Sequence, residues 1–180
     1  MAMGRREVRR RRLGDRWGAT PDEIAADYPC DEFVPSATCE AWRAVTVDAP
    51  IGVVWRWLMQ VRLAPYSYDW IDNLGRKSPD TMLMLDDPQV GQHFSTAFGR
   101  RFGEVLAVEP QRSLTARIMG TTMCYDLHPI DAGRTRLVLK LAAQCPPVLA
   151  EALAMGDLVM ARRQLLNFKK LAELSAVNAR

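Results

Sequence analysis

Apolar and polar residues alternate with a period of two through much of the second half of the chain. Residues 114–119, 123–128 and 137–142 all follow this pattern. Because successive side chains of a strand point to opposite faces of a sheet, the pattern predicts strands with one buried face. Residues 131–133 (Asp-Ala-Gly) are a hairpin signal, so neighbouring strands are expected to pair antiparallel. Shorter or less regular runs at 38–47, 82–84 and 104–109 predict three further strands.

Two other segments have the period of an α-helix. The first follows residues 48–50 (Asp-Ala-Pro), a helix-start signal, and reaches Gln60, which is expected to face away from the apolar stripe. The second runs from Pro147 to Val177 as one long amphipathic helix, unless Asp157 caps a separate segment. The apolar residues expected to face the core are Ile51, Val54, Trp55 and Leu58 in the first helix, and Leu158, Ala161, Leu165, Phe168 and Ala172 in the second.

The order of these elements predicts an α+β fold. A first strand leads into two short helical segments, several antiparallel strands follow, and the long helix closes the chain. That helix is the remaining element long enough to cover the apolar face of the sheet, so we expect a curved antiparallel sheet wrapped around it. A small apolar ligand can occupy space left between sheet and helix.

Arginine is concentrated at the start of the chain. Residues 1–16 contain seven Arg and two acidic residues, with few apolar side chains to bury, and such a segment is expected to be partly flexible. Thr20 and Pro21 suit the N-cap and first position of a short helix. We therefore expect an Arg-rich lead-in over residues 1–37 and one folded domain over 38–180. As a separate hypothesis, the arm Arg5–Arg16 binds nucleic acid or an anionic surface and makes the chain an interaction module.

The sequence lacks the residues that several classes of function require. No window approaches the roughly eighteen apolar residues that span a bilayer. Two distant His and four Cys without C-x-x-C spacing form no recognisable ligand set, so no metal is expected. No phosphate-binding loop, dinucleotide-binding turn or G-x-S-x-G elbow is present, and no cofactor is expected. Reduced thiols in a cytoplasmic protein are the simplest interpretation of Cys30, Cys39, Cys124 and Cys145.

Three segments carry a resemblance to a known superfamily. They are VTVDAPIGVVWRWLMQ at 45–60, APYSYDW at 64–70 and GDLVMARRQLLNFKKLAE at 156–173. In this order, with strands between the second and third, they resemble the START-like or SRPBCC superfamily, which includes birch-pollen-allergen-like, lipid-transport and polyketide cyclase/dehydrase proteins. The likeness covers roughly residues 38–175 and implies the helix-grip fold.

The resemblance implies a hydrophobic ligand, such as a lipid, a polyketide or an aromatic compound, held between the sheet and the C-terminal helix. A carrier or sensor is the leading interpretation. The alternative is an enzyme similar to the polyketide cyclases, aromatases and dehydratases. Fold alone does not choose between them, and the sequence contains no motif to carry over as catalytic.

Three aromatic residues, Tyr66, Tyr68 and Trp70, follow a proline and suit the rim of a pocket. They can gate the pocket and bind a ligand through a phenol. The alternative, preferred for Trp70, is that they anchor the second helical segment on the sheet. Nine methionines favour a pliable interior that adapts to irregular shapes.

The candidates for acid–base or electrostatic catalysis are Tyr68, His93 and Arg117. His93 is expected at the start of a strand, either pointing inward as a general base or lying at the surface. Arg117 faces solvent if Leu114 faces the core, and enters the cavity in the opposite register. The full set of expected ligand-binding residues is Tyr66, Tyr68, Trp70, His93, Phe98, Arg117, Met123, Tyr125, Met160 and Gln164.

Overall fold

The computed structural model describes residues 14–72 and 74–178, without the side chains of residues 72 and 147–157. The strands are β1 Arg16–Trp17, β2 Cys39–Val47, β3 Ser95–Ala97, β4 Arg100–Phe102, β5 Glu104–Glu109, β6 Ser113–Ile118, β7 Thr121–Asp131 and β8 Arg134–Ala143. The α-helices are α1 Pro21–Ala25, α2 Ile51–Met59, α3 Asp69–Asp72 and α4 Pro147–Asn178, and the 3-10 turns are η1 Pro29–Phe33 and η2 Gln60–Arg62. This order confirms the predicted α+β fold.

Six strands form the main sheet in the order β1-β2-β8-β7-β6-β5. All neighbours pair antiparallel except β1 and β2. The predicted hairpin is confirmed, because Asp131 opposes Arg134 and its carboxylate accepts the Gly133 N–H at 2.9 Å. The expected strand at 82–84 is wrong, because residues 82–90 form an extended loop with Met84 75% exposed. β3 and β4 form a separate hairpin.

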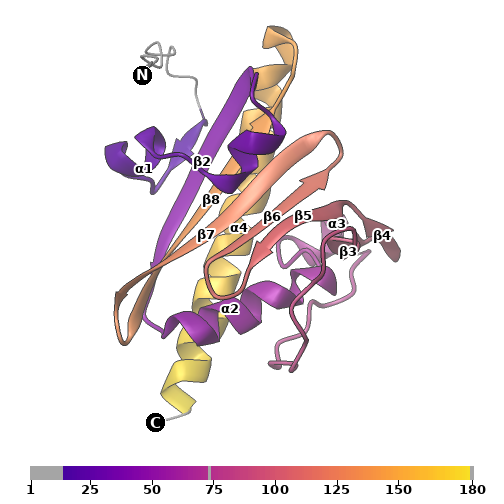
Figure 1. Cartoon of the computed structure of the whole chain (residues 1–180). Helices are drawn as coiled ribbons and strands as arrows, with labels where there is room; N and C mark the ends of the chain where they lie inside the picture. Colours follow the sequence, from indigo (N-terminus) through magenta and orange to yellow (C-terminus); the bar gives the residue numbers. More distant parts are fainter. Residues whose placement is uncertain (1–13, 73, 179–180) are drawn as a thin grey trace.

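Helix α4 passes behind the sheet in Figure 1, and the first short helix, α1, lies beside β2 at the left. The predicted apolar face of α4 is largely confirmed by burial, and the helix continues without a break through Gly156. The sheet contributes Leu127, Leu137 and Leu139 to the same core. The fully or largely buried α4 residues are Ala161, Leu165, Phe168, Ala172 and Ala176.

Helix α2 lies beside α4 and presents Val54, Trp55 and Leu58 to the core, as its period predicted. The expectation for Gln60 is wrong, because this side chain is completely buried. The chain tightens into η2 at Gln60, so the 3.6-residue period no longer gives the direction of the side chain. Its Nε2 donates to the Tyr66 hydroxyl at 2.7 Å, and its Oε1 accepts the Leu83 N–H.

The segment 14–37 covers the outer face of the sheet, the face opposite α4. Thr20 caps α1 as predicted, and Glu23 completes a reciprocal capping box. Residues from η1 and from three strands then form a second apolar cluster, separate from the main core. Its buried members are Tyr28, Cys30, Trp42, Ala44, Cys124 and Val138.

Two cations of β8 fasten this segment to the sheet. The Lys140 side chain is fully buried, with its Nζ 2.5 Å from Asp31 and 3.3 Å from Glu40. Its ammonium also lies 5.3 Å from the centres of the Tyr28 and Trp42 rings. Buried ammonium groups need such partners, because an unpaired charge in the interior is costly.

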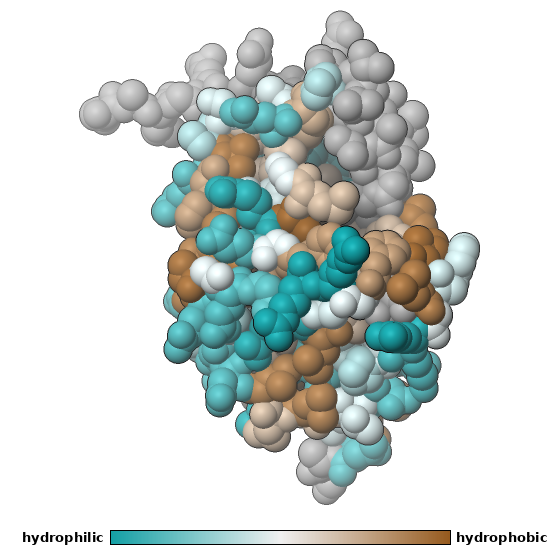
Figure 2. Space-filling model, turned by 90° about the vertical axis from the view of Figure 1, so that its right-hand side faces the viewer, coloured by the Kyte–Doolittle hydropathy of each residue, from teal (hydrophilic) through white to brown (hydrophobic). Residues whose placement is uncertain are grey.

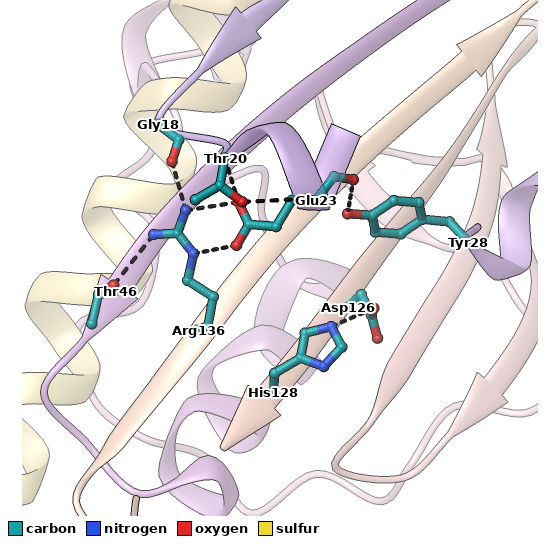
Figure 3. Close-up of polar contacts among 8 residues, drawn as sticks. All are labelled: Gly18, Thr20, Glu23, Tyr28, Thr46, Asp126, His128 and Arg136. Carbon is teal, nitrogen blue, oxygen red and sulfur yellow. Dashed lines mark hydrogen bonds and ion pairs between the residues drawn. The ribbon is translucent and has the colours of Figure 1, made fainter. Parts of the chain in front are cut away.

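The second cation is Arg136, which Figure 3 shows between strand β2 and the start of α1. Its Nε and one terminal nitrogen donate to the two oxygens of Glu23 at 2.6 and 2.9 Å, a two-pronged contact. Further bonds reach the Thr46 hydroxyl and the Gly18 carbonyl. The sheet therefore has two buried faces, whereas the alternation of apolar and polar residues predicted only one.

The cysteines differ from the expectation of four reduced thiols. Cys39 and Cys145 form a disulfide, which is a correction. Sequence spacing gave no sign of the pairing, because the two residues are 106 positions apart and meet only when β2 pairs with β8. Cys30 and Cys124 are free and buried, so they pack as small apolar residues.

Candidate functional site

A groove of about 680 Å³ lies between α4 and the segment 66–80. This size falls in the range typical of small-molecule sites. Figure 2 views the side of the molecule that lies at the right in Figure 1, and apolar and hydrophilic surface alternate there. The residues that line the groove are Tyr66, Ser67, Tyr68, Asp69, Trp70, Lys77, Ser78, Pro79, Asp80, Arg163, Asn167, Lys170, Leu171 and Leu174.

Tyr66 occupies the buried side of the groove in an uncommon backbone conformation. Its φ of 57° lies in the left-handed region, which bulky residues rarely adopt. The ring packs between Trp57 and Phe168, with ring centres 6.5 and 5.1 Å away. The hydroxyl accepts from Gln60, and the carbonyl accepts from the Asn167 amide at 2.7 Å. Contacts on every side thus hold a strained residue, a pattern concentrated at functional sites.

Burial raises the pKa of Tyr66 to about 12, although the hydrogen bond from Gln60 opposes this shift. The phenol therefore stays neutral at physiological pH and acts as a hydrogen-bonding group, not as a base. Tyr68 is half-buried beside it, and the Arg163 guanidinium lies over its ring at 5.7 Å from the centre. Such cation–π stacking holds both side chains at the wall of the groove.

Trp70 is 74% exposed at the rim. The preferred expectation that it anchors the second helical segment on the sheet is wrong. The reason is the shortness of α3, which has four residues and too little length to present a regular inward face. An exposed indole beside a groove offers a large apolar surface to a ligand.

Tyr125 and Gln164 meet in the interior, between strand β7 and helix α4. The Tyr125 hydroxyl donates to Gln164 Oε1 at 2.6 Å, and Gln164 Nε2 donates to the Pro65 carbonyl at 2.6 Å. Phe94 stacks on the Tyr125 ring with centres 6.2 Å apart. Protein groups therefore satisfy both of these polar side chains, which link strand β7 to helix α4.

The other expected site residues lie apart from the groove. Met123 and Met160 are half-buried, and Met123 packs against the main core. Phe98 is 46% exposed at the turn between β3 and β4, where it contacts Phe102 edge-on. Arg117 is exposed on the outer face, because Leu114 faces the core in the observed register.

His93 precedes β3 and is half-buried. Burial, together with the positive charges of Arg101 and Arg62, lowers its pKa below the usual value. The imidazole is therefore neutral at pH 7 and would be a weak base. Of the three proposed acid–base residues, the groove contains Tyr68 but neither His93 nor Arg117.

Sequence reasoning missed two groups of polar residues. Arg163 and Lys170 of α4 line the groove. Their spacing of seven residues, two turns of one helix face, was the available signal. On the outer face, the Asp126 carboxylate contacts His128 at 2.7 Å and Arg112 at 3.3 Å. Figure 3 shows this pair near Tyr28, and the D-x-H spacing on one strand face could have predicted it.

Among residues 14–72 and 74–178, no group of three or more His, Cys, Asp or Glu side chains is arranged to hold a metal ion. Over the same part of the chain, no helix combines the length and the apolar character needed to cross a bilayer.

Proteins of known structure share this fold. A scan against protein-family models and a search of curated proteins each found no match. Among solved structures, a Nitrosospira multiformis protein matches with a TM-score of 0.52 and 12% identity, over 78% of this chain and 99% of that one. A Nitrosomonas europaea protein matches with 0.52 and 16%, over 76% and 96%.

The Polyketide_cyc-like protein of Corynebacterium glutamicum matches with a TM-score of 0.47 and 17% identity, over 76% of this chain and 92% of that one. At these identities the likeness concerns architecture alone. The likeness to the Nitrosospira multiformis and Nitrosomonas europaea proteins agrees with the antiparallel sheet, the short helices after β2 and the long closing helix described above. The chain therefore has the predicted helix-grip fold, an antiparallel sheet packed against a long C-terminal helix.

Proposed function

We propose that the chain binds a hydrophobic small molecule in the groove beside α4, as a carrier or sensor. The observation that supports this function is the groove itself, in which the aromatic residues Tyr66, Tyr68 and Trp70 meet the apolar side chains of Leu171 and Leu174. Aromatic walls with a few polar groups are typical of sites for small organic ligands.

The position differs from the one that the sequence resemblance implied. All described lining residues come from segment 66–80 and from α4, and none comes from a strand. In the described part of the interior, Tyr66 and Phe168 occupy the centre of the core. The ligand is therefore proposed to lie against the far side of the helix from the strands, with Tyr66 forming the link between groove and core.

The cyclase-like alternative has less support. It relies on Tyr68, His93 or Arg117, and of these only Tyr68 lines the groove, since Arg117 is on the outer face and His93 lies outside the groove lining. A catalytic group must lie within hydrogen-bond reach of the reacting atoms. Binding without chemistry is the function that the geometry supports best.

A fluorescent apolar probe tests the proposal. N-phenyl-1-naphthylamine, which is uncharged at neutral pH, is expected to bind the full chain and increase in fluorescence. Trp70→Ala removes the exposed indole from the groove and should weaken binding by about tenfold, the effect of roughly 1.4 kcal/mol. The matched control is Met84→Ala, which removes a residue that is 75% exposed and outside the groove lining.

No binding by the unaltered chain, or equal binding by both variants and the unaltered chain, would contradict the proposal. Native mass spectrometry of freshly purified protein gives an independent readout, because a carrier or sensor is expected to retain an apolar adduct. Loss of that adduct in Trp70→Ala but not in Met84→Ala would place it in the groove.

A further inference from the structure

The charges in the groove are divided between its two walls. On the wall formed by segment 66–80, both carboxylates already have partners. Asp69 accepts the Ser78 N–H at 2.9 Å and the Ser78 hydroxyl at 2.6 Å. Asp80 pairs with Lys77 at 2.5 Å. These bonds fasten the loop to itself, with Asp80 paired to a cation and Asp69 held by neutral donors.

The wall formed by α4 carries two cations, Arg163 and Lys170. They are seven residues apart, so they lie on one helix face about 10 Å from each other along the axis. In the described part of the chain, no carboxylate lies within ion-pair distance of either cation. The helix therefore presents to the groove two positive charges that have no ion-pair partner among the described residues.

Arg163 is also oriented. Its guanidinium lies over the Tyr68 ring at 5.7 Å, a cation–π contact that does not occupy its N–H donors with a hydrogen-bond acceptor. Those donors match the two oxygens of a carboxylate. Stacking on an aromatic ring reduces the side-chain entropy that would be lost when an acid binds.

Apolar surface continues from the cations along the same groove. Leu174 is 51% exposed and lies one turn beyond Lys170, while Trp70 faces it from the opposite wall. From Arg163 to Leu174 the helix rises by about 16 Å, at 1.5 Å per residue. The groove thus combines a cationic region with an elongated apolar region.

From this arrangement we infer that the ligand of the groove is an amphiphilic acid, with its carboxylate on Arg163 and Lys170 and its apolar part along Trp70, Leu171 and Leu174. The inference rests on the proposed function and adds the chemical class of the ligand. The acid binds as a free molecule in the groove. Its carboxylate supplies the ion-pair partner that Arg163 and Lys170 lack among the described residues.

The test compares two probes of one chain length, dodecanoate and uncharged dodecanol, by isothermal titration calorimetry of the full chain below micelle-forming concentrations. Dodecanoate is expected to bind about tenfold more tightly or better, as charge-assisted bonds to a carboxylate imply. Arg163→Gln and Lys170→Gln should each lower dodecanoate affinity by about 5- to 30-fold and leave dodecanol unchanged. The matched control is Arg162→Gln, which removes the same charge from a neighbouring residue that stacks on Trp17 outside the groove.

The outcomes separate this inference from the proposed function. Equal affinity for the two probes, or equal effects of Arg163→Gln and Arg162→Gln, would overturn the inference and leave apolar binding intact. Binding of neither probe would overturn both. Binding to phosphatidylglycerol vesicles without binding of monomeric dodecanoate would also overturn it, because recognition would then belong to a lipid surface.

Discussion

The two faces of the main sheet are closed by different chemistry. On the inner face, α4 and α2 contribute Leu165, Phe168 and Trp57, and the polar groups there are neutral amides and phenols. On the outer face, residues 14–37 are held by buried or half-buried cations, chiefly Lys140 and Arg136. Burial of apolar area is non-directional, whereas each cation requires a partner at a defined place.

This difference explains how the short segment 14–37 is held in one position. The apolar cluster beneath residues 14–37 is small and is built around Tyr28, Trp42 and Val138. The charged contacts fix the position of the segment, since Lys140 can meet Asp31 only when η1 lies across β8. We expect the inner face to contribute most of the stability. The contacts on the outer face are expected to determine where residues 14–37 lie on the sheet.

The largest effect is expected for Phe168→Ala. Phe168 is fully buried between Tyr66 and the sheet, and removal of a buried Phe side chain costs about 3–5 kcal/mol. Urea unfolding followed by circular dichroism measures this loss. The control is Phe98→Ala, at a residue 46% exposed, which should have a much smaller effect. Equal losses in the two variants would show that the inner face is not the dominant core.

The next effect concerns Lys140. The double variant Asp31→Asn/Glu40→Gln keeps the shape of both partners but leaves the ammonium without a negative charge, and loss of the partner of a buried charge costs about 3 kcal/mol. Adding Lys140→Met should recover most of that loss, because a hydrophobic side chain of similar volume needs no partner. A double variant as stable as the unaltered chain, or no recovery in the triple variant, would contradict the buried-pair interpretation. Asp80→Asn, at a fully exposed pair, is the control and should not shift the unfolding midpoint.

The smallest effect is a pH dependence at Glu23. Burial raises the pKa of this carboxyl, but the bonds from Arg136 and from the Thr20 backbone outweigh burial and lower it below 4.5. The folded state therefore binds the proton less readily than the unfolded state, so this stabilisation is present above pH 4.5 and is lost as pH falls through the folded value. Glu23→Gln should cost up to about 1 kcal/mol at pH 7 and should flatten the fall in stability below pH 4.5. An unchanged acid profile in this variant would assign the pH dependence to other carboxyls.

The inner face was predictable from the sequence because its signals are local. Period-two alternation gave β6, β7 and β8 their inward residues, and the spacing of Ala161, Leu165 and Phe168 gave α4 its buried face. Turn chemistry at Asp131 and capping at Thr20 are equally local. Such features need only neighbours within four residues to be recognised.

The outer face and the groove were less predictable because they depend on distant partners. Lys140 has the position of a solvent-facing residue in an alternating strand, and its carboxylates lie about one hundred positions earlier in the chain. Gln60 turns inward only because a 3-10 turn replaces the helix there. Aromatic composition did predict three residues of the groove, but the cations opposite them come from α4 and needed the tertiary structure.

The disulfide between Cys39 and Cys145 gives the chain the connectivity of a ring with two branches. The ring contains strands β2 to β8 and helices α2 and α3, whereas residues before Cys39 and after Cys145 extend from it as tails. A protease that cuts once within the ring therefore releases no fragment until the disulfide is reduced. If a protease nicks the loop at 82–90, the two parts of the chain will still migrate as one molecule as long as the disulfide is intact.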